Sequence, residues 1–358
     1  MDGKARGSHE ATEALVGDIE ALTLSAPATG ADPFDAVVSN ALPAFSTVKD
    51  LGIFIWRPQN PKRVDFKPHA DTTEQDIASR LVVAPKPTDV PVLHLENVKL
   101  PIDFARNIRP QPLANRFPND HGVAAALAAA AARGIQMNSV DFVLGGSALN
   151  VLSTRSTAGK VYLVQRAHNA ITIGKHSEYT SDLSARGFQF ERLCTGEGMA
   201  ARANEDCAVS MQLALVGPFR TVFHAELDAV DASGSHVEIK SGNPHKFGSK
   251  EMYQMVASRS RTLVFARCQG NTIVEIEQCG IEDVAKWLTD AKRATLQDAI
   301  LETMRELKEL AADISEDEPS QLVFVNGHVQ LSPRPDLSQL PSREVVASLL
   351  TRAAVDTP

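Results

Sequence analysis

Alternating hydrophobic and polar positions run through the middle of the chain and predict a domain rich in strands. Short apolar runs with a period of two recur between residues 140 and 280, among them "KVYLVQRA", "CAVSMQLALVG", "TVFHAELDAVD" and "TIVEIEQCG". Runs of this kind, bounded by Gly, Asn, Asp and Ser, are typical of β-strands. Near the C-terminus, "QLVFVNGHVQLSP" predicts a hairpin with Asn-Gly at its turn.

Helical patterns separate these strands. The segment "HGVAAALAAAAARGIQ" (121–136) is rich in Ala and has Gly near its end, which predicts a helix. "SKEMYQMVASRS" and the amphipathic stretch 282–313 predict further helices, and another is expected around Glu178–Arg186, ending at Gly187. The pattern as a whole predicts an α+β fold with mixed, largely antiparallel β-sheets flanked by helices.

Composition divides the chain into three parts. Residues 1–40 have few large hydrophobic side chains and predict a flexible N-terminal tail, with at most a transient helix over "ATEALVGDIEAL". Residues 41–330 are expected to form a single α/β catalytic domain, and the many prolines of 41–120 favour short strands and irregular loops. Residues 331–358 are expected to form a C-terminal extension.

Charge and cysteine content narrow the function classes only a little. The 358 residues carry a formal net charge of −8, which argues mildly against nucleic-acid binding through a broad basic surface. Such a chain still binds nucleic acid through a local patch or through metal ions. The four cysteines form no C-x-x-C motif, and no apolar run has the length of a signal peptide core or a membrane span. We expect an intracellular protein, nuclear or cytoplasmic, without membrane contact.

Charged side chains occupy two adjacent strands where apolar ones are expected. Glu226 and Asp228 lie in "TVFHAELDAVD", and Glu238 and Lys240 lie in "HVEIKSG". Residues i and i+2 of a strand share a face, and the polar turn "DASGS" predicts a hairpin that makes the two strands neighbours. Three carboxylates then crowd together. Alternating charges are also typical of a solvated sheet face, so the pattern alone leaves both interpretations open.

A divalent cation explains why a fold would keep such a cluster. Neighbouring carboxylates repel each other, and an all-oxygen ligand set selects Mg²⁺ or Mn²⁺. Asp228, a turn and then Glu238-x-Lys240 is the Asp…Glu-x-Lys arrangement of many metal-dependent nucleases. In that arrangement the acids hold metal, and the Lys holds a phosphate oxygen or the attacking hydroxide.

Two further segments add candidate residues. "GFQFE" (187–191) ends in Glu191, which by itself fits a surface position equally well. In "KEMYQM", Lys250 and Gln254 are four residues apart and share one face of a helix, which could point to a phosphate or to solvent.

In this order, these segments resemble the DXO family of RNA 5′-end decapping enzymes and 5′→3′ exoribonucleases. The likeness spans about residues 120–330 and is carried by "GFQFE", "ELD", "EIK" and Gln254. It implies a PD-(D/E)XK-like nuclease core and a metal-dependent hydrolase in RNA 5′-end quality control. Family members act by decapping, by deNADding, as pyrophosphohydrolases, as 5′→3′ exoribonucleases or as 5′-hydroxyl dinucleotide hydrolases.

The resemblance also implies a role for each candidate. It assigns metal binding, with two Mg²⁺ or Mn²⁺ ions, to Glu191, Glu226, Asp228, Glu238 and the backbone carbonyl of Ile239. It assigns catalysis to Glu226, Asp228, Glu238, Lys240 and Gln254. It assigns contact with the substrate to Lys240, Gln254 and Lys250. The implied partners are RNA 5′ ends and a larger 5′→3′ exoribonuclease.

One motif departs from the family. Its first motif places an Arg, commonly as Trp-Arg-Gly, where this chain has Gly145 and Gly146 in "LGGSAL". Arg155, Lys160 or Lys246 are candidates to compensate. Two alternatives therefore stay open: a DNA endonuclease with the same Asp…Glu-x-Lys chemistry, and a non-catalytic partner that binds RNA or stabilises an exonuclease. The missing Arg is the sequence feature that favours the second alternative.

Overall fold

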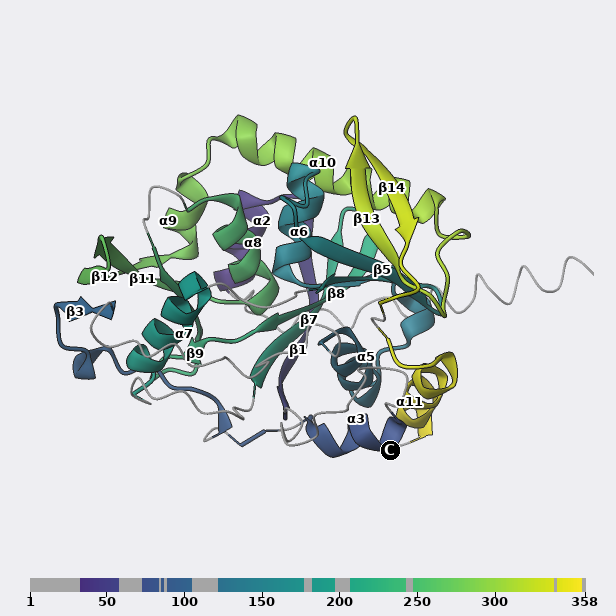
Figure 1. The fold of residues 1–358 in the computed structure, drawn as a ribbon, viewed down its shortest axis with the longest axis horizontal. Coiled ribbons are helices and arrows are strands. Elements are labelled where there is room, and N and C mark those ends of the chain that lie inside the picture. Colours follow the sequence, from purple (N-terminus) through teal and green to yellow (C-terminus); the bar gives the residue numbers. More distant parts are fainter. Residues whose placement is uncertain are drawn as a thin grey trace, which may run out of the picture.

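Two β-sheets form the centre of the molecule (Figure 1). The computed structural model describes residues 33–57, 73–83, 85–86, 89–104, 122–176, 182–196, 207–242, 247–337 and 340–355. The strands of these ranges are β1 (Phe45–Trp56), β2 (Leu81–Val82), β3 (Ile102–Asp103), β4 (Phe142–Leu144), β5 (Val161–Ala167), β6 (Ala170–His176), β7 (Cys207–Val216), β8 (Phe219–Glu226), β9 (Ala229–Val230), β10 (His236–Ser241), β11 (Thr262–Gln269), β12 (Thr272–Gly280), β13 (Ser320–Val325) and β14 (His328–Pro333).

Helices lie between and around the strands. The α-helices are α2 (Pro33–Ala41), α3 (Glu74–Arg80), α5 (Gly122–Ala132), α6 (Gly146–Thr154), α7 (Asp182–Cys194), α8 (Ser249–Ser258), α9 (Ile281–Lys286), α10 (Asp290–Glu309) and α11 (Arg343–Val355). Two short 3₁₀ helices are η2 (Leu95–Asn97) and η3 (Met137–Ser139). Among the described helices, none is long and apolar enough to cross a membrane.

The larger sheet has nine strands in the order β14-β13-β5-β6-β4-β8-β7-β1-β2. Most of its neighbours are antiparallel, but β4 pairs in parallel with both β6 and β8. These three central strands therefore end at the same edge of the sheet. Ligand sites of open sheets with parallel strands lie at such carboxyl ends, so the topology already indicates where a site belongs.

The smaller sheet has five strands in the order β3-β12-β11-β10-β9. Only β10 and β11 run in parallel, and the other pairs are antiparallel. The predicted α+β class with mixed, largely antiparallel sheets is confirmed.

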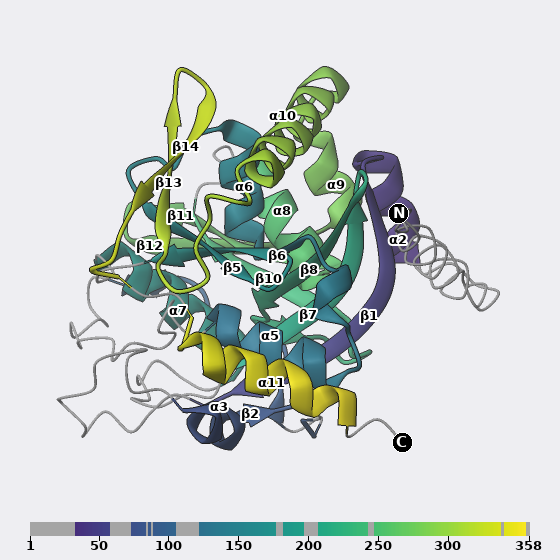
Figure 2. The ribbon, with the colours of Figure 1, turned by 90° about the vertical axis from the view of Figure 1, so that its right-hand side faces the viewer.

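Helices cover both faces of the larger sheet, as Figure 2 shows. Phe142 and Leu144 of β4 point into the core under α2, α6, α8 and α10, while Val143 between them points into the core under α5 and α11. This alternation is what a strand buried on both faces requires. Helix α7 packs on the smaller sheet instead, through Phe190 and Cys194.

Several sequence predictions are confirmed element by element. The Ala-rich segment forms α5, "SKEMYQMVAS" forms α8, and the stretch 282–313 forms α9 and α10. The Asn-Gly hairpin joins β13 and β14 across Asn326 and Gly327, which both have positive φ angles of 52° and 82°. A two-residue turn of this conformation matches the twist of the flanking strands.

The predicted boundary of the N-terminal tail at residue 40 is wrong. Residues 33–41 form α2, and Phe34 and Val38 on it are buried in the core above the larger sheet. Two large apolar side chains four residues apart suffice to anchor a helix, although the composition around them is that of a tail. The transient helix expected over "ATEALVGDIEAL" lies outside the described residues.

The sequence interpretation of two other regions is corrected. Helix α7 does not end at Gly187 but continues to Cys194, because packing of Phe190 and Cys194 on the smaller sheet outweighs the roughly 1 kcal/mol that a mid-helix Gly costs. The run of strands expected between residues 140 and 280 is interrupted near its start by α6. Strand β4 consequently pairs with β6 rather than β5, and in parallel.

Candidate active site

The acidic segment that suggested a metal site crosses from one sheet to the other. Strand β8 ends in the larger sheet at Glu226, Leu227 is buried, and β9 begins the smaller sheet at Ala229. Only Ala229 and Val230 pair with β10. In the predicted hairpin, therefore, only two residues of each strand pair with each other. Glu226 ends β8 and Asp228 lies between β8 and β9, so the two acids do not lie on one face of a single strand. The backbone changes sheet because Leu227 buries its side chain beside β1 and β7 residues.

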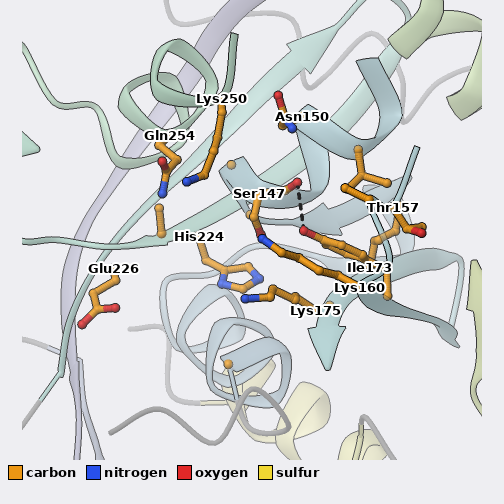
Figure 3. A pocket seen from close by; sticks show the side chains of 18 of the residues that line it. Ser147, Asn150, Thr157, Lys160, Ile173, Lys175, His224, Glu226, Lys250 and Gln254 are labelled. Carbon is orange, nitrogen blue, oxygen red and sulfur yellow. Dashed lines mark hydrogen bonds between the residues drawn. The ribbon is translucent and has the colours of Figure 1, made fainter. Parts of the chain in front are cut away.

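The predicted site residues nevertheless line one cavity of about 390 Å³. Glu226 lies at the carboxyl end of β8, at the same edge of the sheet as the carboxyl ends of β4 and β6. Asp228 arrives from the crossing segment. Figure 3 shows part of the wall, with the ends of Gln254 and Lys250 close to each other and Glu226 apart from them. The predicted residues whose side chains line this cavity are Glu191, Glu226, Asp228, Glu238, Lys240, Lys250 and Gln254.

Lys240 lies at the centre of the acidic group. Its ammonium is 3.3 Å from Asp228 Oδ2, forms an ion pair with Glu238 and donates to the backbone carbonyl of Ile239 at 3.1 Å. Asp228 Oδ2 also accepts the backbone N–H of Ile239 at 2.7 Å. The side chains of Asp228 and Glu238 are only 8% and 4% exposed, so these contacts form away from bulk water.

The carboxylates of the site strongly influence one another. The pKa of Glu238 is raised to about 7, mainly by burial and also by the charges of Asp228 and Glu226, while Lys240 opposes the shift. Burial alone would lower the pKa of Lys240, but Asp228, Glu238 and Glu191 hold it well above its ordinary value. The group therefore carries more negative charge than one ammonium balances.

Glu191 reaches the cavity because α7 is anchored on the smaller sheet. Phe190 and Cys194 are fully buried on that side, which turns Glu191 toward the acids. Burial raises the pKa of the Cys194 thiol to about 12, with further contributions from the charges of Glu191 and Asp228. Glu191 and Asp228 therefore both lie close enough to Cys194 to raise its pKa, although they come from different segments of the chain.

Helix α8 supplies the predicted pair Lys250 and Gln254, one turn apart, at the cavity wall. The Oε1 atom of Gln254 is buried and has no hydrogen-bond partner in the part of the chain that the structure describes. Since an unsatisfied buried amide oxygen costs about 1–3 kcal/mol, this atom is suited to accept a hydrogen bond from a bound water or ligand.

The donor set fits a divalent metal ion. Four carboxylates and the Ile239 carbonyl are the oxygen ligands that Mg²⁺ and Mn²⁺ take. Among the described residues, no three Asp, Glu, His or Cys side chains converge closely enough to hold an ion as they stand. The ammonium of Lys240 contacts Asp228, Glu238 and the Ile239 carbonyl instead. A cation thus already lies against three of the expected ligands.

The missing Arg of the first motif has a structural reason. Gly145 and Gly146 begin α6 at the end of β4, and a Cβ atom at Gly146 would lie 2.7 Å from both the Gln254 Cα and the Tyr253 carbonyl oxygen. A Cβ at Gly145 would lie 2.9 Å from the His224 carbonyl oxygen. The start of α6 therefore packs directly on the backbones of α8 and β8, and no side chain fits at Gly146 without displacing them.

Of the three suggested substitutes for that Arg, one lines the cavity. Lys160 does so. Arg155 points elsewhere, with its guanidinium paired to Glu302 and Glu306 of α10. Lys246 lies outside the described residues.

Lys175, which was not predicted from the sequence, also lines this wall. It follows Ile171 and Ile173 on the same face of β6, and Ile173 also lines the cavity. A Lys two residues after two apolar residues that alternate along a strand is expected on the same buried face, and this pattern could have indicated Lys175 as a site residue. His224, also in the wall, is buried enough to lower its pKa to about 4.

Comparison with known proteins places this geometry on a known fold. No protein family model and no curated protein matches the sequence. Among solved structures, S. pombe Rai1 in complex with 3′-FADP matches with a TM-score of 0.54 at 13% identity, over 81% of this chain and 94% of Rai1. The chain has the Rai1 fold.

Two other Rai1 structures match similarly. Candida albicans Rai1 in complex with pU5-Mn²⁺ gives a TM-score of 0.55 at 12% identity, over 84% of this chain and 95% of that one. Scheffersomyces stipitis Rai1 in complex with (3′-NADP)⁺ and a calcium ion gives a TM-score of 0.51 at 12% identity, over 85% of this chain and 95% of that one. Since Rai1 proteins are of the DXO family, the resemblance seen in the sequence is confirmed for the fold.

Proposed function

We propose that this chain is a metal-dependent hydrolase that acts on RNA 5′ ends. The observation that carries the proposal is that Glu191, Asp228 and Glu238, from three separate segments, line one cavity of a Rai1 fold and all act electrostatically on Lys240. Closely spaced carboxylates can bind divalent cations, and bound divalent cations can promote in-line displacement at a phosphorus atom.

The proposed roles follow from position. A bound divalent cation would supply Lewis acidity at the phosphorus atom and a nucleophilic hydroxide. Glu191, Glu226, Asp228, Glu238 and the Ile239 carbonyl would hold it. Lys240, released from these oxygens, would bind a non-bridging phosphate oxygen. The unpartnered Oε1 of Gln254 would orient the attacking water by accepting its proton in a hydrogen bond.

The ligands of the structural relatives support this choice of substrate. One Rai1 structure holds pU5 with Mn²⁺, another 3′-FADP, and a third (3′-NADP)⁺ with calcium. All are nucleotides, and two are accompanied by a divalent cation. RNA 5′ ends, including nicotinamide-capped ones, are therefore the substrates to test first. A larger exoribonuclease partner and a nuclear or cytoplasmic location remain predictions from the family resemblance.

A substrate panel tests the proposal. Purified protein with Mn²⁺ or Mg²⁺ would be given RNAs of one sequence with NAD, triphosphate, monophosphate or hydroxyl 5′ ends, beside single- and double-stranded DNA. We expect release of 5′-terminal products from RNA. Asp228→Asn and Glu238→Gln should lower the rate at least about a hundredfold, the scale of losing one contact to a developing charge.

The matched control is Asp298→Asn, which changes an exposed carboxylate of α10. Its rate should equal that of the wild type. If the wild type and the Glu226→Ala, Asp228→Ala double variant behave alike on every RNA, the hydrolase proposal fails and a non-catalytic RNA-binding role takes its place. Cleavage of DNA without cleavage of RNA would instead support the endonuclease alternative.

A further inference from the structure

A group of three lysines lies in the cavity apart from the carboxylates. Lys160 precedes β5, Lys175 is on β6 and Lys250 is in the first turn of α8, and all three line the wall. Figure 3 shows Lys160 and Lys175 on one side of His224 and Glu226 on the other. We call Lys160, Lys175 and Lys250 the lysine cluster.

The three ammonium groups repel one another. The pKa of Lys175 is lowered by burial and then by the charges of Lys160 and Lys250. Burial also lowers the pKa of Lys250; the charges of Lys240 and Lys160 lower it further, while those of Glu251 and Glu238 oppose the shift. Within the described ranges, none of the three ammonium groups forms an ion pair or a hydrogen bond. The carboxylates that act on Lys250 therefore do so without a direct ion pair, and the cluster's ammonium groups stay open to an anion.

Neutral hydrogen-bond donors face the same space. Helix α6 begins at this wall, its N-cap Gly145 offers no side chain to cap it, and Gly146 and Ser147 line the cavity. The free N–H groups and the partial positive charge of a helix start favour an anion. The buried Nε2 atom of His224, also in the wall, has no hydrogen-bond partner among the residues described.

We propose that the lysine cluster binds the terminal phosphate at the 5′ end of the RNA, an inference that rests on the proposed function. A terminal phosphomonoester carries about −1.5 to −2 charges at pH 7, whereas an internal phosphodiester carries about −1. Three ammonium groups that form no ion pair within the described residues favour the more highly charged group. The cluster thus makes a 5′-phosphorylated RNA end the preferred substrate over a 5′-hydroxyl end.

A binding measurement without metal isolates this site from catalysis. The full chain, in EDTA, would be titrated with fluorescent RNAs of one sequence that carry either a 5′-monophosphate or a 5′-hydroxyl. The wild type should bind the 5′-phosphorylated RNA at least about tenfold more tightly, as charge-assisted hydrogen bonds of the lysines imply. Lys175→Ala and Lys160→Ala should each reduce this ratio, and together they should bring it to about one.

Matched variants separate charge from fold. Lys292→Ala removes an exposed lysine of α10 that does not line the cavity, and it should leave the ratio unchanged. Lys175→Arg should preserve most of the preference. Lys160 is exposed in a turn, so Lys160→Ala alone reports on binding even if Lys175→Ala unfolds the chain.

The pH dependence gives a second readout. The second ionisation of a terminal phosphate has a pKa of about 6. This series is measured on Glu238→Gln, because Glu238 of the wild type has a pKa of about 7 and titrates in the same range. The preference for the 5′-phosphorylated RNA should weaken from about pH 7.5 to about pH 5.5, because the phosphate loses its second charge.

Equal affinity of the wild type for the two RNAs overturns the inference, and so does an equal loss of the ratio in Lys292→Ala. Failure of the proposed function looks different. A chain that prefers the 5′-phosphate in EDTA but cleaves no RNA with Mn²⁺ retains the lysine site without the hydrolase. A chain that cleaves RNA without this preference retains the hydrolase without the lysine site.

Discussion

At the scale of single residues, the unusual feature of the site is the position of Lys240. Its ammonium contacts Asp228, Glu238 and the Ile239 carbonyl, the oxygens expected to hold metal. Without metal, a buried carboxylate group of this charge needs a cation, and Lys240 provides one from within the chain. Under the proposed function, a metal ion that binds these oxygens would displace Lys240 and so free it to contact phosphate.

Lys240→Met tests this exchange. In EDTA the variant should unfold several degrees below the wild type, because loss of one partner of a buried ion pair costs on the order of 3–5 kcal/mol. Added Mn²⁺ should raise the melting temperature of the variant more than that of the wild type, since the ion no longer displaces an ammonium. Thermal melts followed by circular dichroism at several Mn²⁺ concentrations measure both effects.

Lys292→Met, on the surface of α10, is the control and should melt like the wild type under both conditions. If Mn²⁺ shifts Lys240→Met and the wild type equally, the ammonium and the metal do not compete for the same oxygens.

The raised pKa of Glu238 predicts a pH dependence of stability. Burial moves this pKa from 4.5 to about 7 in the folded chain. Between these values the folded chain holds a proton that the unfolded chain has released, so stability is highest at low pH and falls as pH rises toward 7. Glu238→Gln lacks this titration. In EDTA, the variant should therefore gain stability relative to the wild type between about pH 5 and pH 7.5, by up to a few kcal/mol.

Urea unfolding of both proteins across this range gives the difference directly. Only the difference is informative, because every other titrating group is common to the two proteins. A difference that stays constant with pH would mean that Glu238 does not titrate in this window.

At the scale of elements, the sequence correctly predicted the helices and strands whose own hydrophobic periodicity matches the face that they bury. Glu238 and Lys240 of "EIK" do lie on a strand, β10, and Lys250 and Gln254 do share one face of α8. The sheet change at Leu227 could not be predicted, because a strand pattern says nothing of which sheet each residue joins. Helix α6 was missed since its apolar residues continue those of β4 without a capping signal other than Gly145.

The contact between α6 and α8 predicts an unusual response at Gly146. A Gly→Ala change near a helix start normally stabilises by up to about 1 kcal/mol. Here the added Cβ would lie 2.7 Å from the backbone of α8, so Gly146→Ala should instead destabilise by about 1–3 kcal/mol, the usual effect of overpacking. Because Gln254 is on the displaced backbone, activity on RNA should fall as well.

Ser147→Ala, one residue along α6, is the matched control and should leave the melting temperature nearly unchanged, since no hydrogen bond of the Ser147 hydroxyl is found in the described part of the chain. A stabilised Gly146→Ala protein would show that α6 and α8 are free to separate, and that the absence of an Arg here has no steric cause.

At the scale of the whole molecule, the site exists only because the two sheets meet. Glu226 belongs to the larger sheet, Glu238 and Lys240 to the smaller one, and Glu191 to a helix packed on the smaller one. The acids could be found from the sequence because they keep a family order, and Lys160 and Lys250 could be named as separate candidates, but their grouping with Lys175 could not. Lys175 lies on β6, which pairs in parallel with β4, and Lys160 lies near it, directly before β5. The pairing of β6 with β4 is a long-range contact that no local pattern encodes.

A cation held by ligands from both sheets should therefore stabilise both at once. Hydrogen–deuterium exchange with and without Mn²⁺ tests this at the level of segments. We expect slower exchange at the end of β8, in β10 and in α7 together, because the ion would tie Glu226, Glu238 and Glu191 to each other. Asp228→Asn, which weakens the ligand joining the two sheets, should abolish the protection in all three segments. Protection confined to β10 would mean that the metal is held by the smaller sheet alone, and Glu226 would then lose its proposed role.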